Sequence, residues 1–169
     1  MKITRIAQLI FVALLALALP ARADTMSVPS KEKAAFTFDV PSDWKPKGDP
    51  NDESAEASAP DDSAYVSAWI AAGDEKTFVK DLASTLKDSM KTIDPGYEET
   101  EADQHGTHFY VITGSGVDKR AGTKVKFLVG LFQAGEGKVG IVYADYDADA
   151  AASTMTVLKG ILNSVKVTK

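Results

Sequence analysis

The feature that most constrains the fold is a pair of apolar stretches, Val125 to Phe132 and Val139 to Tyr143, joined by a short connection that contains Gly135 and Gly137. Each stretch has the length of a strand, and its apolar residues would face both sides of a sheet. So short a connection fits antiparallel neighbours, because parallel strands need a long crossover. The two stretches therefore predict an antiparallel sheet that is covered on both faces.

Two other segments, Glu75 to Lys91 and Ala148 to Val165, have the apolar spacing of amphipathic helices. Asp74 is placed to cap the first helix, and Asp94-Pro95-Gly96 to end it. One helix on each face would cover the sheet. The predicted fold class is therefore α+β, a mostly antiparallel β-sheet sandwiched between two α-helices in an α/β/α sandwich. Further strands are expected at Phe36 to Val40, Ala55 to Ser58, Tyr65 to Ala71, Tyr97 to Asp103 and His108 to Thr113, with a turn at Gly114 to Gly122.

The first 23 residues have the pattern of a cleavable export signal. Lys2 and Arg5 give a positive start, the stretch from Ile6 to Leu19 carries no charge, and Ala21-Arg22-Ala23 fits the cleavage pattern. The apolar stretch is shorter than the roughly 20 residues of a spanning helix. We therefore expect cleavage near Ala23 and a periplasmic or secreted protein without a membrane span.

The mature chain is expected to consist of a flexible lead-in at residues 24–35 and a single α+β domain at residues 36–169. Removing the signal takes away three basic residues and no acidic one, so the net charge changes from −5 to −8. Such a charge argues against nucleic acid as a partner, since both would repel each other. The chain has no cysteine, which excludes a lipid anchor on cysteine, disulfides and thiolate metal sites.

The segment from Phe36 to Trp44, Phe-Thr-Phe-Asp-Val-Pro-Ser-Asp-Trp, resembles the opening of the PsbP-like superfamily, and the element order is similar. The resemblance extends over roughly Phe36 to Val167. It implies an α/β/α sandwich and a binding role rather than an enzyme, as in the periplasmic DcrB-like members. The group has no shared catalytic motif, and this chain lacks the lipid-bearing cysteine of DcrB-like proteins. One scaffold also hosts unrelated activities.

Asp103, His105 and His108 are weak candidates for a metal site, because the histidines are three residues apart beside several acids. The alternative is a tight hairpin turn centred on His105-Gly106, which would pair Asp103 with His108 and need no metal. Two ligands on a turn do not complete a four-coordinate site. No metal and no cofactor are therefore expected.

The candidate binding residues are a basic cluster and one aromatic. Lys119, Arg120, Lys124 and Lys126 form the one basic cluster of an acidic protein, which can mark a docking surface for an anionic partner. The alternative is a solvated hairpin face, whose four cations could be replaced by serine with little loss of stability. Trp44 lies outside any regular pattern, so it is a candidate to line a pocket or an anchor over the end of the sheet.

No motif completes a catalytic or ion site. Asp145-x-Asp147-x-Asp149 lacks the glycine and glutamate of a calcium loop and is interpreted as helix N-terminal acids. Gly114-Ser115-Gly116 does not match a nucleophile elbow. The function predicted is a non-enzymatic exported binding or accessory protein that docks on another envelope protein. The alternative is a small-ligand or metal-binding periplasmic protein.

Overall fold

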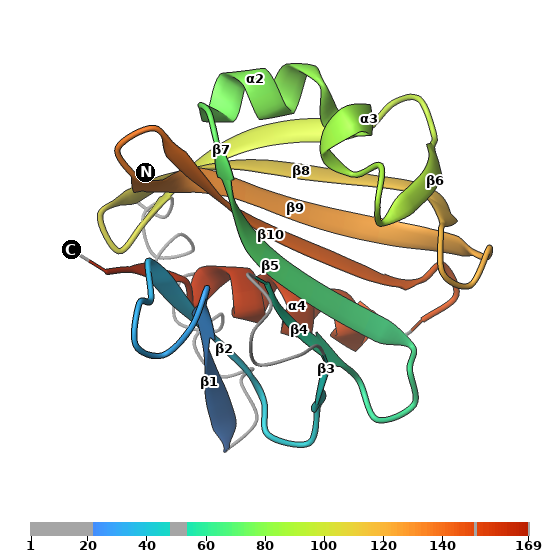
Figure 1. Ribbon diagram of the computed structural model, residues 1–169. Helices are drawn as coiled ribbons and strands as arrows, with labels where there is room; N and C mark the ends of the chain where they lie inside the picture. Colours follow the sequence, from blue (N-terminus) through green and yellow to red (C-terminus); the bar gives the residue numbers. More distant parts are fainter. Residues whose placement is uncertain (1–21, 48–53, 151, 169) are drawn as a thin grey trace, which may run out of the picture.

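An eight-stranded antiparallel sheet forms the centre of the computed structural model, which describes residues 22–47, 54–150 and 152–168 (Figure 1). Its strand order is β3-β4-β5-β10-β9-β8-β6, and β7 also pairs with β8. The mostly antiparallel sheet of an α+β fold is therefore confirmed. The strands are β3 (Lys45–Lys47), β4 (Ala55–Ser58), β5 (Ala64–Ala72), β6 (Met90–Ile93), β7 (Glu98–Gln104), β8 (Thr107–Asp118), β9 (Lys124–Gly135) and β10 (Lys138–Asp147).

A second, three-stranded sheet contains β1 (Ala23–Val28), β2 (Phe36–Pro41) and β11 (Lys166–Val167), in the order β1-β2-β11. Residues 23–28 pair with β2 over the full length of β1, so the first part of the lead-in predicted at residues 24–35 is a strand. Val28 is fully buried. Met26 and Val28, two positions apart, face the core beneath α4 (Ala152–Asn163), although the segment looked polar as a whole.

Within the described residues, three short helices accompany the sheets, α2 (Glu75–Lys80), α3 (Leu82–Thr85) and α4 (Ala152–Asn163). Figure 1 shows α4 and the small sheet on one side of the large sheet, and α2 and α3 on the other. The prediction of two helices, one on each face, is not confirmed. Two hydrophobic cores lie on the two faces of the large sheet. Leu158, Ile161 and Leu162 of α4 pack into the core beneath α4, and Leu82 and Leu86 pack into the core beneath α2 and α3.

The strands β9 and β10 are apolar on both sides because each side belongs to a different core. Leu128 and Phe132 of β9 lie in the core beneath α4, whereas Phe127, Val129 and Leu131 lie in the core beneath α2 and α3. Alternate residues of a strand face opposite sides of the sheet. The two-faced pattern in the sequence thus correctly indicated cover on both faces.

The prediction of a single helix at Glu75 to Lys91 is wrong, because two short helices and the start of β6 occupy this segment. Asp74 caps α2 as predicted, accepting hydrogen bonds from the backbone N–H and the hydroxyl of Thr77. Asp81 then leaves helical geometry, with φ −117° and ψ 55°, and its carboxylate accepts the Ser84 N–H, so that a new helix begins. The chain leaves this second helix at Leu86 and enters β6.

The turn expected at Gly114 to Gly122 is shorter than predicted, because β8 continues to Asp118. Gly116 is required by close approach: a Cβ there would lie 2.2 Å from the carbonyl oxygen of Thr92 on β6. The turn itself is confined to residues 119–123. The helix predicted at Ala148 to Val165 is found as the shorter α4.

The predicted signal peptide lies almost wholly outside the described residues, as does part of the acidic segment between Gly48 and Asp62. Of the helices in residues 22–47, 54–150 and 152–168, none is both long and apolar enough to cross a membrane.

Candidate functional site

The candidate site is an open pocket where the edge of the large sheet changes partner. Strand β7 pairs with β8 as far as Thr113, and β6 pairs with it from Gly116 onwards. The turn between β6 and β7 lies beside the part of β8 between these two pairings. There the N–H of Asp94 donates to the carbonyl of Ser115 at 2.9 Å, and the Ser115 hydroxyl donates to the Asp94 carboxylate at 2.9 Å. These bonds fix one wall of the pocket.

The pocket has a volume of about 330 Å³ and is lined by both apolar and charged side chains. Segments far apart in the chain meet there, from the β6–β7 turn, strands β8, β9 and β10, and α4. This volume is at the low end of the range of about 300–1,000 Å³ for ligand pockets. The lining residues are Asp94, Pro95, Gly96, Tyr97, Glu98, Thr113, Gly114, Ser115, Lys126, Phe127, Tyr146 and Met155.

Tyr146 and Lys126 form an adjacent pair of hydrogen-bond donors in this pocket, opposite each other on β10 and β9. The Tyr146 side chain is 5 % exposed, and its hydroxyl has no hydrogen-bond partner among the described residues. Burial raises the pKa of Tyr146, so the hydroxyl keeps its proton at neutral pH. Lys126 is exposed and has no ion-pair partner in the part of the chain that the structure describes.

The opposite wall carries the acidic groups and the exposed aromatic. Asp94 and Glu98 flank the turn, and Tyr97 between them is 38 % exposed, the one large hydrophobic side chain so exposed among the described residues. Gly114 permits this arrangement: a Cβ there would lie 3.0 Å from the Tyr97 Cβ and 2.6 Å from Cζ of Phe127. The turn can therefore close over the strand only because Gly114 has no side chain.

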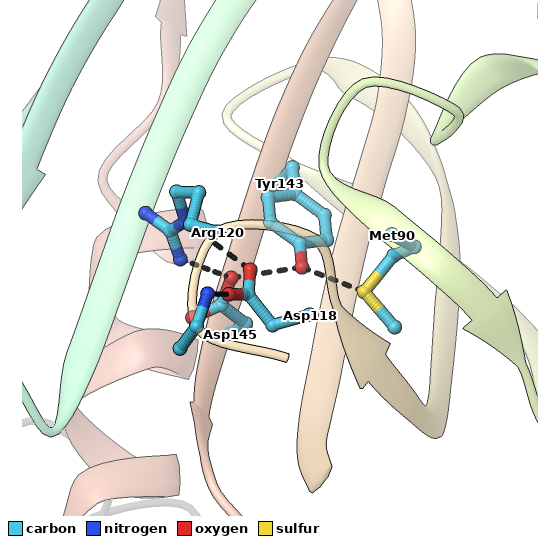
Figure 2. Close-up of polar contacts among 6 residues, drawn as sticks. Met90, Asp118, Arg120, Tyr143 and Asp145 are labelled. Atoms are coloured by element: carbon cyan, nitrogen blue, oxygen red, sulfur yellow. Dashed lines mark hydrogen bonds and ion pairs between the residues drawn. The ribbon is translucent and has the colours of Figure 1, made fainter. Parts of the chain in front are cut away.

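A buried polar cluster of Asp118, Arg120, Tyr143 and Asp145 lies at the same end of the sheet (Figure 2). Arg120 donates to Asp145 at 2.8 Å and to Asp118 at 3.1 Å. The Tyr143 hydroxyl donates to Asp145 at 2.8 Å and also contacts the sulfur of Met90 at 3.0 Å. The cluster therefore joins the β8–β9 turn to the middle strand β10.

The electrostatics of this cluster are those of two buried carboxylates that share one guanidinium. Asp118 and Asp145 are 2 % and 4 % exposed. Burial raises the pKa of Asp145 to about 6, against the opposing effects of Arg120 and the Tyr143 hydroxyl. The guanidinium also lies over the Tyr65 ring, 3.6 Å from its centroid. The cluster stabilises the turn and holds Arg120 by two ion pairs, although the Arg120 side chain is 45 % exposed.

The four cations of the predicted basic cluster have different contacts. Arg120 is held in the buried polar cluster. Lys119 donates to the carbonyl of Lys87 at 3.0 Å and lies 3.9 Å from an oxygen of Asp88. Lys124 and Lys126 are both exposed, and only Lys126 lines the pocket. Lys119 and Arg120 are therefore engaged within the chain, whereas docking through the four cations stays a prediction.

Trp44 does not line the pocket. It is 8 % exposed and packs in the core beneath α4, which fits the interpretation of an anchor rather than a ligand contact.

The two histidines occupy the β7–β8 hairpin as the hairpin interpretation predicted. His105 and Gly106 have φ values of 51° and 77°, and Asp103 pairs with His108. Asp103 contacts Nδ1 of His108 at 2.9 Å, while Nε2 of His105 contacts the carbonyl of Asn163 at 3.2 Å. In residues 22–47, 54–150 and 152–168, no three potential metal ligands of the His, Cys, Asp and Glu types come together.

The interpretation of Asp145 as a helix N-terminal acid is wrong, because Asp145 lies in β10 and belongs to the buried polar cluster. Tyr97, Tyr146 and Asp94 were missed as site residues. Asp94 was recognised only as part of a turn, and Tyr146 only as one of several strand aromatics. The available signal was the Asp-Pro-Gly-Tyr sequence itself, a turn followed at once by an aromatic residue.

Comparison with known proteins identifies the fold. No protein-family model matches the sequence, and no curated protein is similar to it. The solution structure of cyanobacterial PsbP (CyanoP) from Synechocystis is similar with a TM-score of 0.60 at 10 % identity, over 88 % of this chain and 94 % of that one. The Ran-binding protein Mog1p of Saccharomyces cerevisiae gives 0.54 at 10 % identity, over 86 % and 95 %.

A protein from Bacteroides thetaiotaomicron gives a TM-score of 0.53 at 14 % identity and covers 86 % of this chain. The match spans 48 % of that protein, about half of its length. At these identities the likeness concerns the fold alone. The PsbP-like fold suggested by the Phe36 to Trp44 segment is confirmed.

Proposed function

We propose that this chain is a non-enzymatic, exported accessory protein that docks on another protein of the cell envelope through the pocket at the edge of its sheet. The observation that carries the proposal is Tyr97, a large aromatic side chain left 38 % exposed beside an open, partly apolar pocket. Exposed aromatics beside pockets are typical of the few residues that dominate protein interfaces.

The fold supports a binding role. The PsbP-like fold is shared with Mog1p, which is described as a Ran-binding protein, and the match extends over nearly the whole of that chain. A fold alone does not determine a function, so the proposal depends on the pocket. Export is supported by the signal-like pattern of the first 23 residues.

The chemistry of the pocket favours binding over catalysis. Ser115 and Lys126 are opposite each other on β8 and β9, which suggests a serine–lysine pair. However, the Ser115 hydroxyl donates to Asp94, and no hydrogen bond joins it to Lys126, which is exposed. A lysine that activates a nucleophile is normally desolvated and within hydrogen-bond reach. The serine here is better described as holding the turn in place.

A small-ligand protein is the second candidate, because the pocket volume of about 330 Å³ is sufficient for a small molecule. Native mass spectrometry of the protein purified from its own envelope distinguishes the two. A stoichiometric small molecule that leaves on unfolding would favour the second candidate.

Site-specific photo-crosslinking tests the docking proposal. A photoreactive residue placed at Tyr97 in the full chain, expressed in the source cells, should give one discrete adduct with an identified envelope protein. The control is the same residue at Lys33, an exposed position in the loop between β1 and β2. Equal adducts from both positions, or none from Tyr97 together with a retained small molecule, would contradict docking at this pocket.

A further inference from the structure

The pocket contains two hydrogen-bond donors that nothing in the described chain uses. Lys126 supplies an ammonium group without an ion-pair partner, and Tyr146 supplies a hydroxyl at the pocket that has no hydrogen-bond partner among the described residues. The two residues are opposite each other on adjacent strands. An adjacent ammonium and hydroxyl together suit a carboxylate.

The pocket also contains acceptors. The carboxylate of Asp94 is held by the Ser115 hydroxyl at 2.9 Å, which leaves further lone pairs available, and Glu98 begins β7 on the same wall. No ion pair joins either acid to Lys126, so the opposite charges remain separate within one pocket. A ligand that carried only negative charge would be repelled by these acids. A ligand with an N–H group close to its carboxylate would satisfy both walls.

The remaining lining is apolar. Met155 and Pro95 offer hydrophobic surface, whereas the Phe127 side chain is fully buried in the core beneath α2 and α3. Met155 is a partly buried residue packed against the core beneath α4, and methionine adapts to side chains of different shapes. An apolar side chain on the ligand can therefore be buried between the donors and the acceptors.

We propose that the pocket captures the C-terminus of a partner polypeptide that ends in an apolar residue. The terminal carboxylate binds Lys126 and Tyr146, the last backbone N–H groups donate to Asp94 and Glu98, and the last side chain packs on Pro95 and Met155. This inference rests on the proposed docking function and specifies the part of the partner that enters the pocket. The pocket is open at the edge of the sheet, so the rest of the partner chain can continue past Tyr97.

Peptide binding to the mature chain tests the inference. The probes are fluorescein-labelled hexapeptides ending in leucine, valine, methionine or phenylalanine, each with a free carboxylate and as its C-terminal amide, together with free leucine. We expect at least one free-carboxylate peptide to bind about tenfold or more tightly than its amide, because a hydrogen-bonded charge is lost. Amide signals of Gly96 and Gly114 should shift in NMR spectra on binding, since both residues line the pocket.

Variants of Lys126 and Tyr146 test whether these two donors bind the terminal carboxylate. Lys126→Gln should weaken binding about tenfold and remove the preference for the free carboxylate. The matched control is Lys124→Gln, because Lys124 is an exposed cation on the same face of β9 that does not line the pocket. Tyr146→Phe removes only the unpartnered hydroxyl, so it should weaken binding several-fold at an unchanged melting temperature.

Three results would overturn the inference. One is that no peptide prefers the free carboxylate, another is that the preference survives in Lys126→Gln, and the third is that free leucine binds as tightly as the best peptide. A partner crosslinked at Tyr97 together with the first result would leave the docking function standing and remove only the C-terminal mode. Failure of both experiments would remove the docking function itself.

Discussion

Replacing Arg120 by alanine should destabilise the protein by about 3 kcal/mol at pH 7.5 and by less at pH 5. Among the described residues, Arg120 is the one cation that contacts the buried carboxylates of Asp118 and Asp145, at 3.1 and 2.8 Å. Removing one partner of a buried ion pair costs roughly 3–5 kcal/mol. The Arg120 side chain is 45 % exposed, so water replaces part of the interaction and the lower end of that range applies.

Protonation limits the cost for each carboxyl group. A buried aspartate can take a proton instead of remaining charged, which costs about 1.36 kcal/mol per pH unit above its ordinary pKa. With the ordinary value of 3.8 for Asp145, this limit is about 5 kcal/mol at pH 7.5 and below about 2 kcal/mol at pH 5. The loss of stability in Arg120→Ala should therefore shrink as the pH falls.

Urea unfolding followed by tryptophan fluorescence at both pH values measures the effect. Lys124→Ala is the control, because Lys124 is exposed and should change the free energy of unfolding by less than about 0.5 kcal/mol. If Arg120→Ala matched Lys124→Ala at pH 7.5, or cost more at pH 5 than at pH 7.5, the buried polar cluster would not be the ion pair described. The earlier expectation that all four basic residues can be replaced without loss therefore applies to the exposed lysines only.

Three further predictions concern the fold. Because the pKa of Asp145 is raised from 3.8 to about 6, the folded state holds its proton longer, so this group lowers stability by up to about 3 kcal/mol as the pH rises from about 4 to 6. Asp145→Asn should remove that slope from the urea unfolding series. Gly130→Ala places a Cβ 2.2 Å from Cδ1 of Leu162 and should cost about 1–3 kcal/mol, less in a Leu162→Ala background; equal costs in both backgrounds would exclude the clash. Leu82→Ala, at a side chain 3 % exposed, should cost about 2–5 kcal/mol in thermal unfolding, and an unchanged melting temperature would contradict its burial.

The strands were predictable because their pattern depends on local chemistry. Alternation at Phe36 to Val40 and the two-faced stretches of β9 and β10 each reflect which side of a sheet is buried, and the structure confirms these strands. The His105-Gly106 turn was predictable for a related reason, since both residues adopt positive φ and the register of the hairpin then follows.

The helix at Glu75 to Lys91 was mispredicted although its buried residues were identified correctly. Leu82, Leu86 and Met90 all lie in the core beneath α2 and α3, as the four-residue spacing indicated. The spacing cannot distinguish a continuous helix from two short helices and a strand that face the same core. The helix is interrupted at Asp81, because the Asp81 side chain caps the following turn and this cap competes with a continuous helix.

The candidate site was only partly predictable from the sequence. It depends on side chains that lack a hydrogen-bond or ion-pair partner among the described residues, and this can be recognised only in three dimensions. Lys126 was identified through its charge. Tyr146 resembled any other strand aromatic, and only the structure shows that its hydroxyl has no hydrogen-bond partner in the described part of the chain. Asp145 and Tyr146 are successive residues of β10 and therefore face opposite sides of the sheet. Asp145 is held by Arg120 and Tyr143 on one side, and this anchors the strand that presents Tyr146 to the pocket on the other. The buried polar cluster thus supports the pocket through the backbone of one strand, a relation that charge and spacing along the chain do not reveal.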